Sequence, residues 1–87
     1  MATAPVGEDE QRAEVIRAIG DLRGIDKAVW STRSTLLVYL DVDDGDDRLR
    51  DICAVLERYE ALRASRLQLQ PPAGSERAVR FVQCRAF

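Results

Sequence analysis

Residues 35–42 read TLLVYLDV, and this stretch decides the fold class of the 87-residue chain. Its hydrophobic residues alternate with a period of two, which predicts a strand that is apolar on both sides. One side would carry Leu36, Val38, Leu40 and Val42, and the other Leu37 and Tyr39. Because Val38 matches Leu36 and Leu40, we assign the first set to the core and expect Leu37 and Tyr39 to point outward.

Two helices are predicted, one before and one after this strand. Residues 8–23 begin with three acidic residues, which the positive end of a helix dipole favours, and Gly24 suits a C-terminal cap. Residues 46–62 have Asp46 as the expected N-cap. The apolar residues at helical spacing are Val15, Ile16, Ile19 and Leu22 in the first helix and Leu49, Ile52, Cys53, Leu56 and Tyr59 in the second. Each helix therefore has a single apolar stripe to bury.

Three further strands are predicted, over residues 25–33, 65–70 and 77–87. The first is close enough to residues 35–42 to form an antiparallel hairpin with them. The second alternates leucine with polar residues, and the PPAGS segment that follows stops it. Residues 1–7 show no periodicity, so we expect a disordered tail followed by a single domain over residues 8–87.

The predicted order is helix, strand, strand, helix, strand, strand. Because both helices have one apolar stripe, both should lie on one face of a four-stranded antiparallel sheet, in a two-layer α+β sandwich. This order resembles a circular permutation of the ferredoxin-like fold. The strand start at Gly24-Ile25 and the strand end at Asp41 are similar to those of ACT and heavy-metal-associated domains, although the Met-x-Cys-x-x-Cys motif of the latter does not occur.

Composition excludes several kinds of chemistry. The chain contains no histidine, which removes the commonest general base and the commonest transition-metal ligand. A net charge of −2 gives no general attraction to nucleic acid or anionic membranes. No apolar run has the length of a membrane span, and the first residues do not resemble a signal peptide, so we expect a cytoplasmic protein. Cys53 and Cys84 fit that compartment as buried, free thiols.

The acidic segment 41–47, DVDDGDD, is the strongest candidate for a metal site. Its spacing does not match a calcium loop, because with Asp41 at position one the glycine falls at position five and Ile52 takes the place of the bidentate glutamate. Glu57 and Glu60 at helical spacing indicate a solvated helix face rather than a catalytic carboxylate pair. We therefore predict no metal, no cofactor, no catalytic residue and no enzymatic activity.

The sheet face that the helices leave open is the predicted working surface. A sheet with one solvated face should alternate cleanly between apolar and polar residues, and contiguous exposed apolar residues mark partner sites. We predict a non-catalytic interaction or regulatory module that forms a homodimer, or binds another protein, through this face. Its expected interface consists of Trp30 (or Val29 in its place), Leu37, Tyr39, Val82 and Cys84.

Two alternatives remain open. The first is a small-molecule sensor with its ligand at a subunit interface, as the resemblance to ACT domains implies. The second is a single-stranded RNA-binding module, in which arginines of the last two strands would flank aromatic side chains of the sheet. Those arginines are Arg66, Arg77, Arg80 and Arg85. The negative net charge and the missing RNP1 pattern count against RNA.

Overall fold

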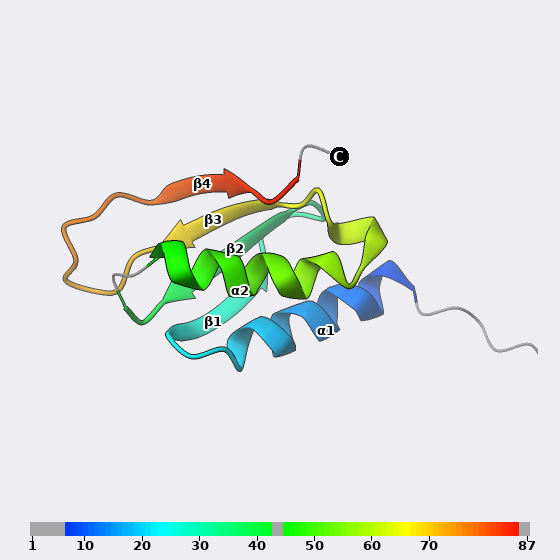
Figure 1. The fold of residues 1–87 in the computed structure, drawn as a ribbon, viewed down its shortest axis with the longest axis horizontal. Helices are drawn as coiled ribbons and strands as arrows, with labels where there is room; N and C mark the ends of the chain where they lie inside the picture. The colour runs from blue at the N-terminus through cyan, green and yellow to red at the C-terminus, as the bar shows by residue number, and fades with distance from the viewer. Residues whose placement is uncertain (1–6, 43–44, 86–87) are drawn as a thin grey trace, which may run out of the picture.

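The structure, a computed structural model, describes residues 7–42 and 45–85 (Figure 1). Its elements are helix α1 (Glu8–Gly20), strands β1 (Ile25–Trp30) and β2 (Thr35–Leu40), helix α2 (Gly45–Glu57), the 3-10 turn η1 (Glu60–Leu62), and strands β3 (Arg66–Gln70) and β4 (Arg80–Gln83). The predicted order of helices and strands is therefore confirmed, and the α+β class with it.

The four strands form one mixed sheet in the order β1-β2-β3-β4. β1 and β2 are antiparallel, β2 and β3 are parallel, and β3 and β4 are antiparallel. The prediction of a purely antiparallel sheet is wrong, because α2 carries the chain back to the starting end of β2 before β3 begins, and such a crossover makes neighbouring strands parallel. A permuted ferredoxin-like sheet would insert the last strand between β2 and β3, whereas β4 lies at the edge. That permutation is not confirmed.

Both helices lie on one face of the sheet, side by side (Figure 1). The predicted core side of β2 is confirmed, since Leu36 and Val38 are fully buried and Leu40 nearly so. Other fully buried side chains come from both helices, η1 and β3: Val15, Ile19, Ile52, Leu56, Leu62, Leu67 and Leu69. Val42 lies beyond the end of β2 and is 38% exposed, so it does not extend the core set.

Several elements are shorter than the sequence predicts. α1 ends at Gly20, and Gly24 has a φ of 84° in the turn that follows, so Gly24 acts in the connection and not as the helix cap. α2 begins at Gly45, one residue before the expected N-cap Asp46, whose side chain lies outside the described residues. β4 spans four residues of the predicted strand 77–87: residues 77–79 belong to the irregular connection 71–79, residues 84–85 follow the strand, and residues 86–87 lie outside the described residues.

Arg12 joins α1 to the hairpin of β1 and β2. Its Nε donates to the carbonyl oxygen of Arg33 at 2.9 Å, and its guanidinium lies 5.7 Å from the centre of the Trp30 ring. The Trp30 indole Nε1 donates to the carbonyl oxygen of Arg12 at 3.0 Å. Trp30 is therefore held on the helix side of the sheet.

Within the described residues, no helix combines the length and the apolar character that crossing a bilayer requires.

Candidate functional site

The face of the sheet opposite the helices is not covered by any element in the described part of the chain (Figure 1). We call it the outer face. The strand register and the alternation from the buried leucines place ten side chains on it: Lys27, Val29, Thr35, Leu37, Tyr39, Arg66, Gln68, Gln70, Phe81 and Gln83. Binding through the outer face has to use these side chains.

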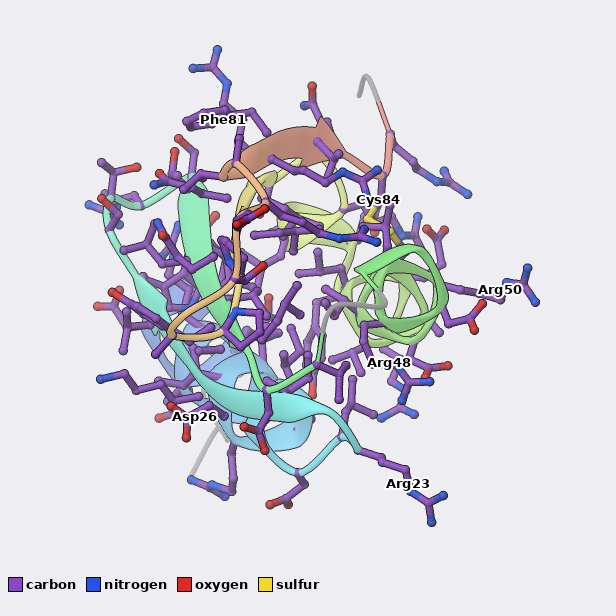
Figure 2. The ribbon with its side chains drawn as sticks, turned by 90° about the vertical axis from the view of Figure 1, so that its left-hand side faces the viewer. Arg23, Asp26, Arg48, Arg50, Phe81 and Cys84 are labelled. Carbon is purple, nitrogen blue, oxygen red and sulfur yellow. A yellow bond between two sulfur atoms is a disulfide. The ribbon has the colours of Figure 1, made fainter. Side chains whose placement is uncertain are left out.

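A row of four residues crosses the whole outer face, one from each strand. Val29 pairs with Leu37, Leu37 with Gln68, and Gln68 with Phe81. We call Val29, Leu37, Gln68 and Phe81 the cross-strand row. Val29 is 39% exposed and Phe81 is 75% exposed. Figure 2 shows Phe81 at the edge of the sheet, pointing away from α2. Three of the four residues are apolar, so the row is the most hydrophobic line on this face.

Tyr39 lies beside the cross-strand row and is opposite Lys27 on β1. The Lys27 ammonium is 4.9 Å from the centre of the Tyr39 ring, within the range of a cation–π contact. Arg66 lies on the other side of the row, between Thr35 and Gln83. The strands add one carboxylate, Asp26, at the irregularity between Ile25 and Lys27. Charge on the outer face is therefore sparse and slightly positive.

The structure divides the five residues of the predicted interface between the two faces. Leu37 and Tyr39 are on the outer face, as expected, and both are half-buried by their neighbours. Trp30, Val82 and Cys84 are on the helix side and pack against the core. The reason is register: Trp30 pairs with the buried Leu36, and Val82 pairs with Leu67. Leu37 and Tyr39 are therefore not brought together with the other three.

Val29 and Phe81 are on the outer face, where the predicted interface had Trp30 (or Val29) and Val82. The sequence left Val29 and Trp30 as alternatives and placed Phe81 on the opposite side of its strand from Val82. That alternation is correct, but the side that faces the core depends on which residue of β4 pairs with which residue of β3. A register between strands joined by nine residues, 71–79, cannot be read from alternation alone.

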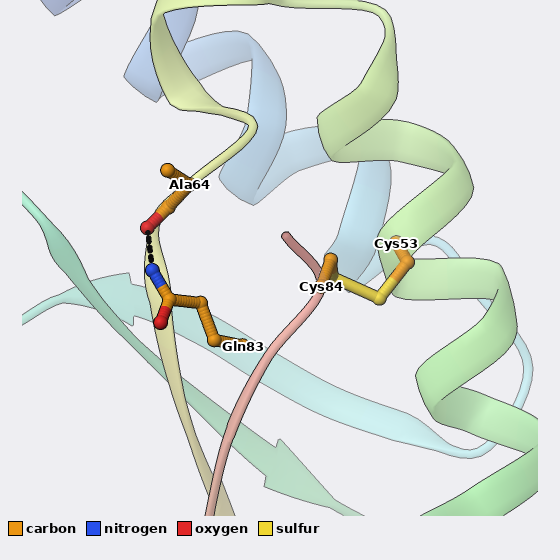
Figure 3. Close-up of a disulfide and its surroundings, with 4 residues drawn as sticks. All are labelled: Cys53, Ala64, Gln83 and Cys84. Atoms are coloured by element: carbon orange, nitrogen blue, oxygen red, sulfur yellow. Dashed lines mark hydrogen bonds between the residues drawn. A yellow bond between two sulfur atoms is a disulfide. The ribbon is translucent and has the colours of Figure 1, made fainter. Parts of the chain in front are cut away.

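Cys53 and Cys84 form a disulfide, so the prediction of free thiols is wrong (Figure 3). Their Cα atoms are 5.7 Å apart, an ordinary separation for a disulfide. Cys53 is in the middle of α2, and Cys84 follows the last residue of β4. The antiparallel pairing of β4 with β3 brings this end of the chain alongside α2. Within the described residues, no free cysteine remains as a nucleophile.

The acidic residues do not gather into a site in the described part of the chain. Asp43 and Asp44, the centre of the acidic segment, lie outside it. Among the described residues, no group of three or more histidine, cysteine or acidic side chains could hold a metal ion. Glu57 forms ion pairs with Arg63 at 3.5 Å and Arg85 at 2.6 Å, which gives it a structural role.

The four arginines of the last two strands do not form one patch. Arg66 is on the outer face, and Arg85 is paired with Glu57 on the helix side. Arg77 is in the connection before β4, and Arg80 pairs with Leu69 on the helix side. Arg66 is thus the one member of this group that lies on the outer face.

The hydrogen bond from the Tyr59 hydroxyl to Glu14 Oε2, 3.1 Å long, raises the pKa of Tyr59 above its usual value of 10.0. The hydrogen bond is the largest cause, because it favours the protonated phenol. It links the segment between α2 and η1 to α1 on the side away from the outer face, so it stabilises the packing of the helices and does not contribute to a binding site.

No protein-family model, curated protein or solved structure matches this chain.

Proposed function

We propose that this domain is a non-catalytic interaction module that associates with a second copy of itself through the outer face. The cross-strand row carries the proposal, because it places Val29, Leu37 and Phe81 on one line across a face that no described element covers. Phe81 is the decisive member. Its side chain is 75% exposed, so burial against a partner removes a large apolar surface from water and favours association.

Charge supports a second copy as the occupant. The two helices each carry four acidic and two basic residues, whereas the four strands together carry one acidic and three basic residues. Packing two outer faces together buries the less charged side of each copy and leaves the acidic helices in water. Two sheets packed face to face lie about 10 Å apart, so their side chains interdigitate.

The cross-strand row is compatible with two-fold symmetry. A two-fold axis parallel to the strands would place Phe81 of one copy over Val29 of the other, and Leu37 over Gln68. Burying a phenylalanine, a valine and a leucine from each copy stabilises the dimer by several kcal/mol at about 25 cal/mol per Å². Association entropy offsets much of this gain, so we expect a dissociation constant roughly in the micromolar range.

A single-stranded nucleic acid is the second candidate occupant. Tyr39 and Phe81 are aromatic side chains on the outer face, and Lys27 and Arg66 are cations beside them. Aromatic side chains and cations on an open sheet bind unpaired bases and phosphates. Only two of the chain's cations lie at outward strand positions, however, which is few for this function.

Light scattering at several salt concentrations tests the proposal and separates these two occupants. We expect the wild type at roughly 100 µM to be a dimer whose stability changes little with salt, because the charges on the outer face are sparse. Binding of a labelled single-stranded oligonucleotide that weakens steeply with salt would instead favour the nucleic-acid function.

The matched variants are Leu37→Glu with Phe81→Ser, on the outer face, and Glu10→Gln with Arg17→Gln, on the exposed side of α1. The first pair should give a folded monomer, and the second should leave the dimer intact. A wild type that stays monomeric throughout, without added nucleic acid, contradicts self-association through this face.

A further inference from the structure

β4 is attached to the domain chiefly through its pairing with β3. It is an edge strand of four residues, and Val82 is the one side chain among them that is half-buried; Arg80, Phe81 and Gln83 are exposed. None of the thirteen buried hydrophobic residues of the core comes from β4. β4 therefore adds no buried residue to the core between the two helices and β1, β2 and β3.

Besides the β3–β4 pairing, a disulfide, a hydrogen bond and an ion pair hold the end of β4 in place. The Cys53–Cys84 disulfide joins it to α2, and Gln83 Nε2 donates to the carbonyl oxygen of Ala64 at 2.6 Å (Figure 3). Arg85 pairs with Glu57 of α2 at 2.6 Å. Gln83 and Arg85 are exposed, and both contacts are open to competition from water. The disulfide is the one covalent link of the three.

We propose that Cys53–Cys84 is a redox modification site, at which thiol–disulfide exchange with a dithiol reductant releases β4 from the edge of β3. Cys53 and Cys84 are each only partly buried, so a reductant can approach the bond. The crosslink joins residues 31 positions apart, so its reduction removes a loop-closure restraint that keeps Cys84 beside α2.

The exchange is balanced in two steps. A thiolate of the reductant attacks the Sγ atom of one cysteine, forms a mixed disulfide and expels the other cysteine as a thiolate. The second thiol of the reductant then attacks the reductant sulfur atom that is bonded to the protein, and the remaining cysteine leaves as a thiolate. The reductant leaves as a disulfide, and Cys53 and Cys84 take up its two electrons and two protons as thiols.

Release of β4 would change which main-chain groups are available for binding. β3 pairs with β4 from Arg66 to Leu69, and loss of that pairing exposes the main-chain donors and acceptors along this edge. The same step removes Phe81 from its position in the cross-strand row. Reduction is therefore expected to move the open edge of the sheet from β4 to β3, where another strand can pair.

Amide hydrogen exchange on the full chain tests this inference, with and without dithiothreitol, in a dilute sample. We expect reduction to accelerate exchange of the amides that bond β4 to β3 by roughly 100-fold, while β1, β2 and the helices change little. Thiol titration establishes that two thiols form. Because the readout is amide exchange in dilute solution, it does not depend on whether the outer face binds a second copy.

Cys53→Ser with Cys84→Ser is the control variant. It should exchange like the reduced wild type and should not respond to dithiothreitol. If exchange of the amides that bond β4 to β3 stays within about threefold of the oxidised rate, with two thiols titrated, the inference is overturned. Circular dichroism detects whether the whole domain unfolds on reduction. Such unfolding also overturns the inference, because the disulfide would then stabilise the entire fold and not β4 alone.

Discussion

Gly24 holds the turn between α1 and β1 in a conformation that other residues rarely adopt. Its φ is 84°, and a Cβ atom built on it would lie 2.9 Å from Cδ of Arg48 and 3.0 Å from Cγ2 of Val42. The Gly24 carbonyl accepts from the amide of Asp41 at 2.8 Å, and Arg48 Nη1 donates to the carbonyl of Arg23 at 2.7 Å. The turn is therefore fixed against both β2 and α2.

Gly24→Ala should destabilise the domain by about 1–2 kcal/mol, because a positive φ is unfavourable for alanine and the added Cβ atom displaces the Arg48 side chain. Gly20→Ala is the matched control, since nothing lies within 4 Å of the added atom and alanine favours a helix end. Urea unfolding of the two variants measures the difference. An equal midpoint for both would show that the turn is not constrained as described.

The Tyr59–Glu14 hydrogen bond predicts a pH effect with a definite sign. Because the pKa of Tyr59 is raised in the folded state, the contact stabilises the fold below pH 10.0, and this contribution is lost as pH rises through the folded pKa. Glu14→Ala should lower the pKa of Tyr59 toward 10.0. Ultraviolet titration in a Tyr39→Phe background, which leaves Tyr59 as the single tyrosine, measures this change; an unaltered titration curve in Glu14→Ala contradicts the assignment.

At the scale of elements, the sequence predicted the patterns within single segments and the antiparallel β1–β2 hairpin, but not the pairing of β3 and β4. The alternation of Leu36, Val38 and Leu40 gave the correct core side of β2, and Leu67 and Leu69 gave that of β3. The direction of β3 relative to β2 depends on where α2 returns the chain, which no local pattern encodes. The Cys53–Cys84 bond likewise joins residues 31 positions apart, and neither neighbourhood signals the other.

The free-thiol expectation had a second premise, a cytoplasmic location, which stays a prediction. Disulfides are rare in that compartment and are usually transient there.

The candidate surface could be predicted in part. Alternation placed Leu37 and Tyr39 on the outer face, but the register that brings Phe81 into line with Leu37 is a property of the folded sheet.

The attachment of α1 to the sheet gives a prediction for an element. Arg12→Ala removes the hydrogen bond to the Arg33 carbonyl, the contact with the Trp30 ring and the ion pair with Glu8, which is 3.2 Å away. The Arg12 side chain is 12% exposed, so we expect a loss of roughly 1–2 kcal/mol. Arg17→Ala, at an exposed position of the same helix, should change stability by less than about 0.5 kcal/mol. Thermal unfolding followed by Trp30 fluorescence compares them, and equal losses would contradict this role of Arg12.

At the scale of the whole molecule, the domain has two unlike sides. The helix side carries most of the acidic residues, and the outer face carries the cross-strand row with few charges. In the proposed self-association, the apolar row would supply the binding energy, and the acidic helices would stay in water.

A dilution series of amide NMR spectra tests the central claim most directly, since it locates the associating surface on the wild type. Between about 1 mM and 10 µM, the account predicts concentration-dependent shifts at Lys27, Val29, Leu37, Gln68 and Phe81 and constant shifts over the exposed sides of α1 and α2. Shifts that concentrate on the helices, or spectra that do not change with concentration, would contradict association through the outer face.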